Sequence, residues 1–81
     1  MQLRKKKTKD GDWIVANDST GGHAHFWTKK GCNAIITLLR KDIEPYDPHF
    51  IEAKRRLLEP TIEEKKDYKQ RYYNVQKGVN Q

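Results

Sequence analysis

The chain has 81 residues, of which 35% are hydrophobic, and it carries a formal net charge of +6 at pH 7. A chain of this length forms one domain with a small core, which leaves little room for a deep enzyme pocket. No segment approaches the roughly 18 apolar residues of a membrane span, and no signal peptide follows the basic N-terminus. A single cysteine, Cys32, excludes an internal disulfide and fits a reducing compartment. We therefore expect a small cytoplasmic protein that is not an enzyme.

Most of the excess charge lies at the N-terminus. From residue 10 onward the chain holds 12 basic and 11 acidic side chains, so the remainder is nearly neutral. Such a basic segment attracts polyanions by neutralising phosphates, although it is also typical of a solvated terminus. We expect residues 1–11 to form a basic N-terminal arm or a first edge strand, and residues 12–81 to form a single α+β domain. The five basic residues that precede the first acid are Arg4, Lys5, Lys6, Lys7 and Lys9.

Turn signals predict two or three short antiparallel strands. Asp10-Gly11 is a preferred hairpin turn, which favours a strand over residues 2–9. Aromatic and β-branched residues mark a strand over 12–17, and Gly21-Gly22 then leads into a strand over 22–28. Which face of the sheet is buried stays open. In the pairing that we expect, Ile14 and Ala16 share one face with Ala24 and Phe26, and the other face holds Trp13, Val15, His23, His25 and Trp27.

The first predicted helix is the strongest in the chain. Thr28 is suited to cap its N-terminus, and Pro45 should end it by about residue 42 or 43. Its apolar residues recur at helical spacing and predict one buried stripe. They are Cys32, Ile35, Ile36, Leu39 and Ile43.

Two further helices follow. Asp47 as N-cap and Pro48 at the first helical position begin the second helix, which Pro60 ends. Thr61 and Glu64 form a capping box, and the third helix is expected over residues 62–76. The apolar stripe of the second helix comprises Phe50, Ala53, Leu57 and the neighbouring Ile51 and Leu58. The elements together predict an α+β fold in which a short two- or three-stranded antiparallel sheet is followed by three helices and packs on the first of them.

The histidine pair is the first candidate for chemistry. His23 and His25 stand at i and i+2 on a strand, so both imidazoles can reach one metal ion. Cys32 or His49 would have to complete the site, but neither has metal-ligand spacing. Cys32 also belongs to the apolar stripe, which favours a core thiol over a nucleophile. We therefore predict no catalytic residue, no metal site and no cofactor.

Two binding surfaces remain. The candidate surface for a protein partner consists of Trp13, His23, His25, Trp27, Tyr68 and Tyr72. The candidate nucleic-acid surface, where aromatic rings stack on bases and cations meet phosphates, consists of Arg4, Lys5, Lys6, Lys7, Lys29, Lys30, Arg55 and Arg56. The structural alternatives are that the tryptophans pack under a helix and that residues 54–56 form a solvated helix side. Tyr72, Tyr73 and the strand edges also leave a homodimer open.

A resemblance favours the protein-binding alternative. The segment His23-Ala24-His25-Phe26, the Lys-Lys-Gly-Cys sequence that opens an apolar helix, and Arg55-Arg56-Leu57-Leu58 resemble small proteins encoded by phages and prophages of Gram-positive bacteria. The resemblance covers residues 12–58. It implies an early-expressed, non-enzymatic protein that binds a host or phage protein and inhibits host machinery or defence. The alternative function is a nucleic-acid-binding accessory protein for DNA or RNA.

Overall fold

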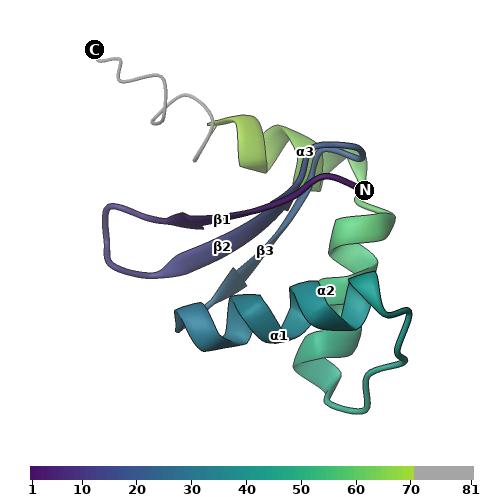
Figure 1. Cartoon of the computed structure of the whole chain (residues 1–81). Helices are drawn as coiled ribbons and strands as arrows, with labels where there is room; N and C mark the ends of the chain where they lie inside the picture. Colours follow the sequence, from purple (N-terminus) through teal and green to yellow (C-terminus); the bar gives the residue numbers. More distant parts are fainter. Residues whose placement is uncertain (71–81) are drawn as a thin grey trace.

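The computed structural model describes residues 1–70, which form a three-stranded antiparallel sheet followed by three helices (Figure 1). The strands lie in the order β1-β2-β3, so the predicted α+β fold is confirmed. The segment that was expected to be either an arm or a strand contains an edge strand. The elements are β1 (Leu3–Lys7), β2 (Trp13–Asn17), β3 (Gly22–Phe26), α1 (Lys29–Arg40), α2 (Pro48–Leu58) and α3 (Ile62–Tyr68).

Helices cover both faces of the sheet. α1 and α2 pack on one face, and α3 lies against the other (Figure 1). The expected packing of the sheet on α1 is therefore only half of the architecture. The smaller cluster, under α3, comprises Ile14, Ala16 and Tyr68. The larger cluster comprises Val15, Ala24, Phe26, Cys32, Ile35, Ile36, Leu39, Ala53 and Leu57.

The pairing of β2 with β3 differs from the prediction by one residue. Val15 lies opposite Ala24, and Ile14 lies opposite His25. Directly opposed residues share a face, so the expected grouping of Ile14 with Ala24 is wrong. Asn17 pairs with Gly22, and this hairpin loop fixes the register for the whole strand pair. The predicted common face therefore does not form, because Trp13 lies on the α1 side of the sheet and His23 lies on the α3 side.

The predicted caps are present in the structure. The Thr28 hydroxyl accepts from the Gly31 N–H at 3.1 Å, and the Asp47 carboxylate accepts from the His49 N–H at 2.8 Å. Thr61 and Glu64 exchange both bonds of the capping box. Side chains at these positions therefore satisfy a backbone amide in the first turn of each helix and mark where the helix begins.

The apolar stripes are shorter than predicted. α1 ends at Arg40, and Asp42 adopts a φ of 56°, so Ile43 leaves the stripe and is exposed. Ile51 and Leu58 of α2 are also exposed. The predicted part of the third helix beyond residue 70, including Tyr72, lies outside the described residues.

Asn17 joins the sheet to α2 from inside the core. Its side chain is 1% exposed, and its Nδ2 donates to the Leu57 carbonyl at 2.9 Å. Its Oδ1 accepts from the Ser19 N–H at 3.0 Å. The amide therefore satisfies two backbone groups, one in a turn and one at the end of a helix.

We expect Asn17→Ala to lower the free energy of unfolding by about 2 kcal/mol, because it removes two hydrogen bonds and leaves a cavity in place of a fully buried amide. The Leu57 carbonyl keeps the Thr20 hydroxyl as a donor at 2.7 Å. Urea denaturation followed by circular dichroism measures this loss. Asn33→Ala, which removes an exposed amide from α1, is the control and should change stability by less than about 0.5 kcal/mol. Equal losses in the two variants would contradict the role assigned to Asn17.

Candidate nucleic-acid interface

The first turn of α1 carries positive charge where a helix favours negative charge. Lys29 and Lys30 are its first two residues, and the turn contains no acid. The helix dipole makes a cation at this end unfavourable by about 0.3–1 kcal/mol. Lys29 Nζ lies 5.9 Å from the centroid of the Trp13 ring, which offsets part of this cost. An anion bound here would offset the rest of this unfavourable free energy.

A groove continues from this point between α1 and the edge strand β1. Its volume is about 250 Å³, and none of its lining residues is acidic. Inside it, Lys5 Nζ donates to Asn33 Oδ1 at 2.6 Å. Because helical residues three or four positions apart are neighbours, Asn33, Thr37 and Arg40 follow Lys29 along one side of α1. The groove is lined by Leu3, Lys5, Asn33, Ile36, Thr37 and Arg40.

The sheet register adds a further cation. Lys7 pairs with Trp13, and Lys5 pairs with Val15, so both lysines lie on the α1 side of β1. We call Lys5, Lys7, Lys29 and Arg40 the cation row. Within residues 1–70, no carboxylate forms an ion pair with any member of the row. The row therefore concentrates uncompensated positive charge along one side of the molecule.

Other predicted basic residues lie elsewhere. Arg4 pairs with Asp18 at 2.6 Å, and its hydrogen bond to that carboxylate raises the pKa of the guanidinium. Lys6 is buried on the α3 side and donates to the Tyr68 hydroxyl. Lys30 is exposed in the first turn of α1 and, like Lys7 and Lys29, does not itself line the groove. Trp13 links Lys7, its partner across the sheet, to Lys29, which lies over its ring. The structure therefore brings together Lys5, Lys7 and Lys29 from the predicted set and separates Arg4 and Lys6 from them.

Arg55 and Arg56 hold α2 against α3 and the sheet. They meet Glu64 Oε2 at 2.6 and 3.2 Å. Arg56 Nε also donates to the His23 carbonyl at 3.2 Å. Burial is the largest influence and raises the pKa of Glu64, but the Thr61 N–H and the two guanidiniums together outweigh it and hold that pKa below its usual value. These arginines therefore have structural partners.

The depressed pKa makes the contribution of Glu64 to stability dependent on pH. The ionised carboxylate stabilises the fold above the ordinary glutamate pKa, and this stabilisation is lost as the pH falls through the lower pKa of the folded state. We expect Glu64→Gln to lose about 1 kcal/mol of stability near pH 7 and much less near pH 3. Thermal unfolding at the two pH values tests this. Glu63→Gln is the control, and an equal, pH-dependent loss in both variants would refute the assignment.

The aromatic residues expected at a protein interface are also divided. His23 and Tyr68 are buried, with their ring centroids 5.3 Å apart. His23 Nε2 lies 3.7 Å from Asp67 Oδ2. Trp27 is 76% exposed, and the ring of His25 meets it edge-on at a centroid distance of 5.6 Å. Among the members of this set within residues 1–70, only the neighbouring His25 and Trp27 present a shared aromatic surface.

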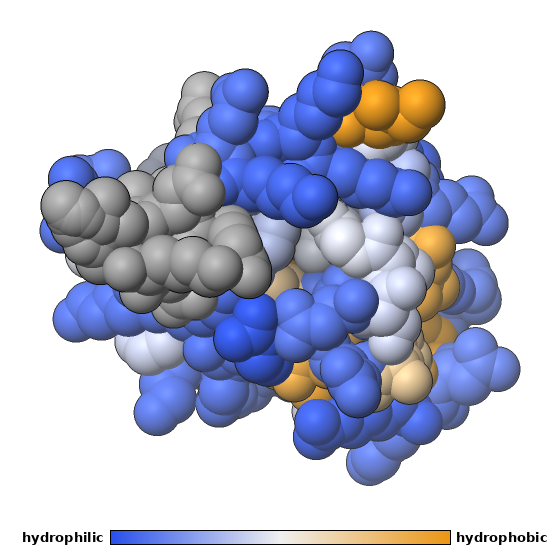
Figure 2. Space-filling model, turned by 90° about the horizontal axis from the view of Figure 1, so that it is seen from above, coloured by the Kyte–Doolittle hydropathy of each residue, from blue (hydrophilic) through white to orange (hydrophobic). Residues whose placement is uncertain are grey.

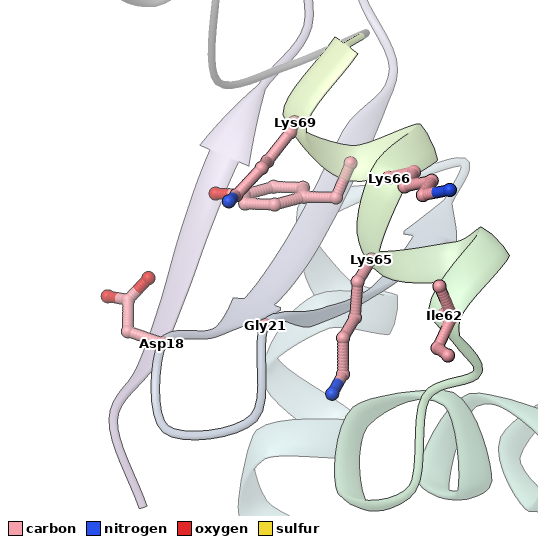
Figure 3. Close-up of a pocket in the computed structure, with 7 residues that line it drawn as sticks. Asp18, Gly21, Ile62, Lys65, Lys66 and Lys69 are labelled. Carbon is pink, nitrogen blue, oxygen red and sulfur yellow. The ribbon is translucent and has the colours of Figure 1, made fainter.

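A second hollow, of about 380 Å³, lies beside α3. Figure 3 shows that the side chains of Lys65, Lys66 and Lys69 extend in different directions around it. Viewed from above, this side of the molecule is mostly hydrophilic, with hydrophobic residues in small separate patches (Figure 2). The hollow therefore lacks the converging cations that would hold one anion.

The histidines do not meet the other metal-ligand candidates. Cys32 is buried in the core on the α1 side, whereas His23 lies on the α3 side. Burial raises the pKa of the Cys32 thiol, which disfavours its thiolate. Residues 1–70 contain no group of three or more histidine, cysteine, aspartate or glutamate side chains placed to hold a metal ion.

The sequence alone indicates Arg40 and Lys41 as candidates for additional phosphate contacts, but it does not indicate Asn33. The spacing of Asn33 from Lys29 was a usable signal, but it acquires meaning only once β1 is known to lie beside this edge of α1. In the described part of the chain, no helix has the length and apolar character needed to cross a membrane. Comparison of the chain with protein-family models, curated proteins and solved structures found no match.

Proposed function

We propose that this chain is a small nucleic-acid-binding protein that holds the phosphate backbone of a strand along the cation row. The observation that carries the proposal is the acid-free groove between β1 and α1, together with Lys29 and Lys30 at the positive, N-terminal end of the α1 dipole. Elsewhere, Arg4, Arg55 and Arg56 each have a carboxylate partner. Lysines on α3 also lack a carboxylate partner within residues 1–70, so the distinguishing feature of the row is that Lys5 and Arg40 meet in one acid-free groove with Lys7 and Lys29 beside it. This convergence supports binding of an external polyanion.

The dimensions of the row suit several phosphates. Lys29 and Arg40 are about 16 Å apart along the axis of α1 at a rise of about 1.5 Å per residue. That distance corresponds to about five nucleotides along one strand of a B-DNA helix. Contacts of this kind position a strand but do not read its sequence. The proposed binding is therefore independent of base sequence.

Fluorescence anisotropy with labelled oligonucleotides tests the proposal. Single-stranded DNA, duplex DNA and RNA are titrated with the protein at several salt concentrations. If the four cations of the row each neutralise one phosphate, the logarithm of the affinity falls with the logarithm of the salt concentration, with a slope of about −2.8 for single strands and about −3.6 for duplex DNA. Absence of binding to all three nucleic acids at about 20 mM salt, where phosphate contacts are strongest, would contradict the proposal.

A second candidate function is binding of a host or phage protein, as the resemblance implies. The observation that favours it is Trp27, which is 76% exposed between the end of β3 and the N-cap residue Thr28. A large aromatic side chain on a well-positioned backbone is typical of an interface anchor. The protein would then act as a non-enzymatic inhibitor of its partner.

We expect Trp27→Ala to weaken capture of such a partner at least about 30-fold, which corresponds to about 2 kcal/mol. The measurement is affinity purification from a nuclease-treated bacterial lysate, followed by titration of the purified partner. Ile62→Ala, which removes another exposed apolar side chain, is the control. If no stoichiometric protein is recovered, this candidate fails while the nucleic-acid proposal is unaffected.

A further inference from the structure

The two edges of the sheet differ in how they are closed. The outer edge of β3 lies against α2, where Arg56 Nε donates to the His23 carbonyl at 3.2 Å. A Cβ at Gly22 would overlap the backbone carbonyl oxygen of Arg56, so the backbones of β3 and α2 are in direct contact there. No strand can be added at this edge without displacing α2.

Among residues 1–70, no strand or helix is hydrogen-bonded to the outer edge of β1. The Gln2 carbonyl accepts from the Asp18 N–H at 2.9 Å, and the Thr8 N–H donates to the Asp12 carbonyl at 2.7 Å. In a regular antiparallel ladder the alternate residues direct their backbone groups to the other side. Leu3, Lys5 and Lys7 thus direct their N–H and C=O groups outward. Within residues 1–70, no hydrogen bond joins these groups to another element.

The charge on β1 restricts what can pair with it. Four of its five residues are basic. Arg4 is paired with Asp18 and Lys6 is buried, which leaves Lys5 and Lys7 exposed and without a carboxylate partner within residues 1–70. Like charges on facing strands repel, and lysine on an edge strand opposes pairing with another copy of the same protein. An acidic strand, in contrast, gains both backbone hydrogen bonds and opposite-charge neighbours.

From the open backbone and this charge, we infer that the outer edge of β1 binds an extended acidic segment of a partner protein as a fourth strand. The outward groups of Leu3, Lys5 and Lys7 supply the backbone hydrogen bonds, and the exposed amines of Lys5 and Lys7 select the acidic sequence. This inference goes beyond nucleic-acid binding and does not depend on it. Because Lys5 and Lys7 also belong to the cation row, an acidic segment competes with nucleic acid wherever both bind.

The test uses a fluorescein-labelled peptide of alternating glutamate and valine, eight residues long, as the probe. A second peptide of the same sequence carries N-methyl groups on alternate amides, on the side that would face β1. It keeps the charge of the probe but cannot form the backbone ladder. We expect the unmodified peptide to bind the wild-type protein at least about tenfold more tightly than the N-methylated peptide, because strand addition depends on main-chain hydrogen bonds.

Two variants at one position separate backbone from charge. Lys5→Ala removes the amine, and Lys5→Pro removes the amine and also the outward N–H, whose loss breaks no bond to β2. We expect Lys5→Pro to bind the probe about tenfold more weakly than Lys5→Ala, while both variants bind oligonucleotide equally. Thermal unfolding of both variants shows whether the fold is kept.

Three results would overturn the inference. They are equal binding of the two peptides by the wild-type protein, equal peptide binding by two folded Lys5 variants, and absence of peptide binding at low salt. The comparison of the two peptides uses only the wild-type protein, so it tests strand addition at β1 even if Lys5→Pro does not fold. A protein that binds the peptide but no oligonucleotide would refute the nucleic-acid proposal and leave this inference standing.

Discussion

Replacing Lys5, Lys29 and Arg40 together by glutamine is expected to weaken oligonucleotide binding about 100-fold, because each lost phosphate contact costs on the order of 1 kcal/mol. The salt dependence should change as well, with the slope becoming less negative by about 2 to 3. The three side chains line or flank the groove and have no carboxylate partner among residues 1–70. The substitutions should therefore leave the fold intact.

The matched control removes the same amount of charge from α3. Lys65, Lys66 and Lys69 are replaced by glutamine, which leaves the net charge equal to that of the first variant. We expect this control to bind within about threefold of the wild-type protein, since distant exposed charges are largely screened. If the two triple variants lose the same affinity, binding follows net charge and the cation row has no special role.

Gly22→Ala is expected to lower the free energy of unfolding by about 3 kcal/mol, a large fraction of the stability of a domain of this size. The added Cβ would overlap the Arg56 carbonyl oxygen and also approach the Pro60 ring. Neither the Arg56 backbone nor the Pro60 ring can move aside for the added methyl group unless α2 shifts away from β3. Urea denaturation measures the loss.

Gly11→Ala separates this overlap from backbone strain. Gly11 has a φ of 92° in the turn between β1 and β2, but a Cβ there would meet nothing within 4 Å. We expect a loss of about 1 kcal/mol, because an L-residue in the left-handed region is strained without a clash. Equal losses of unfolding free energy at the two positions would show that the close contact between β3 and α2 is not the reason why position 22 requires glycine.

The helices could be predicted because their signals are local. Thr28, Asp47 and the Thr61–Glu64 box each lie within a few residues of the amides that they satisfy. The stripe of α1 follows from a spacing that holds for any helix. Only its C-terminal end was predicted too late, because Pro45 marks where a helix must have stopped, whereas the backbone had already turned at Asp42.

The pairing of the strands could not be predicted in the same way. Each strand shows its own alternation, but nothing within a strand states which residue lies opposite which. The turn between Asn17 and Gly22 decides this, and a shift by one residue exchanges the two faces of one strand relative to the other. Trp13 and His23 were assigned to one surface for this reason, although a layer of sheet separates them.

The composition of the candidate site depended on contacts between distant segments. Arg55 and Arg56 look like solvent-facing cations in the sequence, yet both meet Glu64 from the following helix. Arg40 looks like a helix-end residue, yet it lines a groove with Lys5 of the first strand. Whether a lysine is free to bind a phosphate depends on whether a carboxylate lies close enough to pair with it. The position of that carboxylate is set by the tertiary structure and cannot be read from the local sequence.

The most direct test of the central claim is a backbone amide NMR titration of the protein with a single-stranded oligonucleotide. If the groove between β1 and α1 is the binding site, the largest chemical-shift changes occur at Lys5, Lys7, Lys29, Asn33 and Arg40 and at the Trp13 indole, and added salt reverses them. Shifts centred on α3 and Lys65, or no shifts at low salt, would contradict the account.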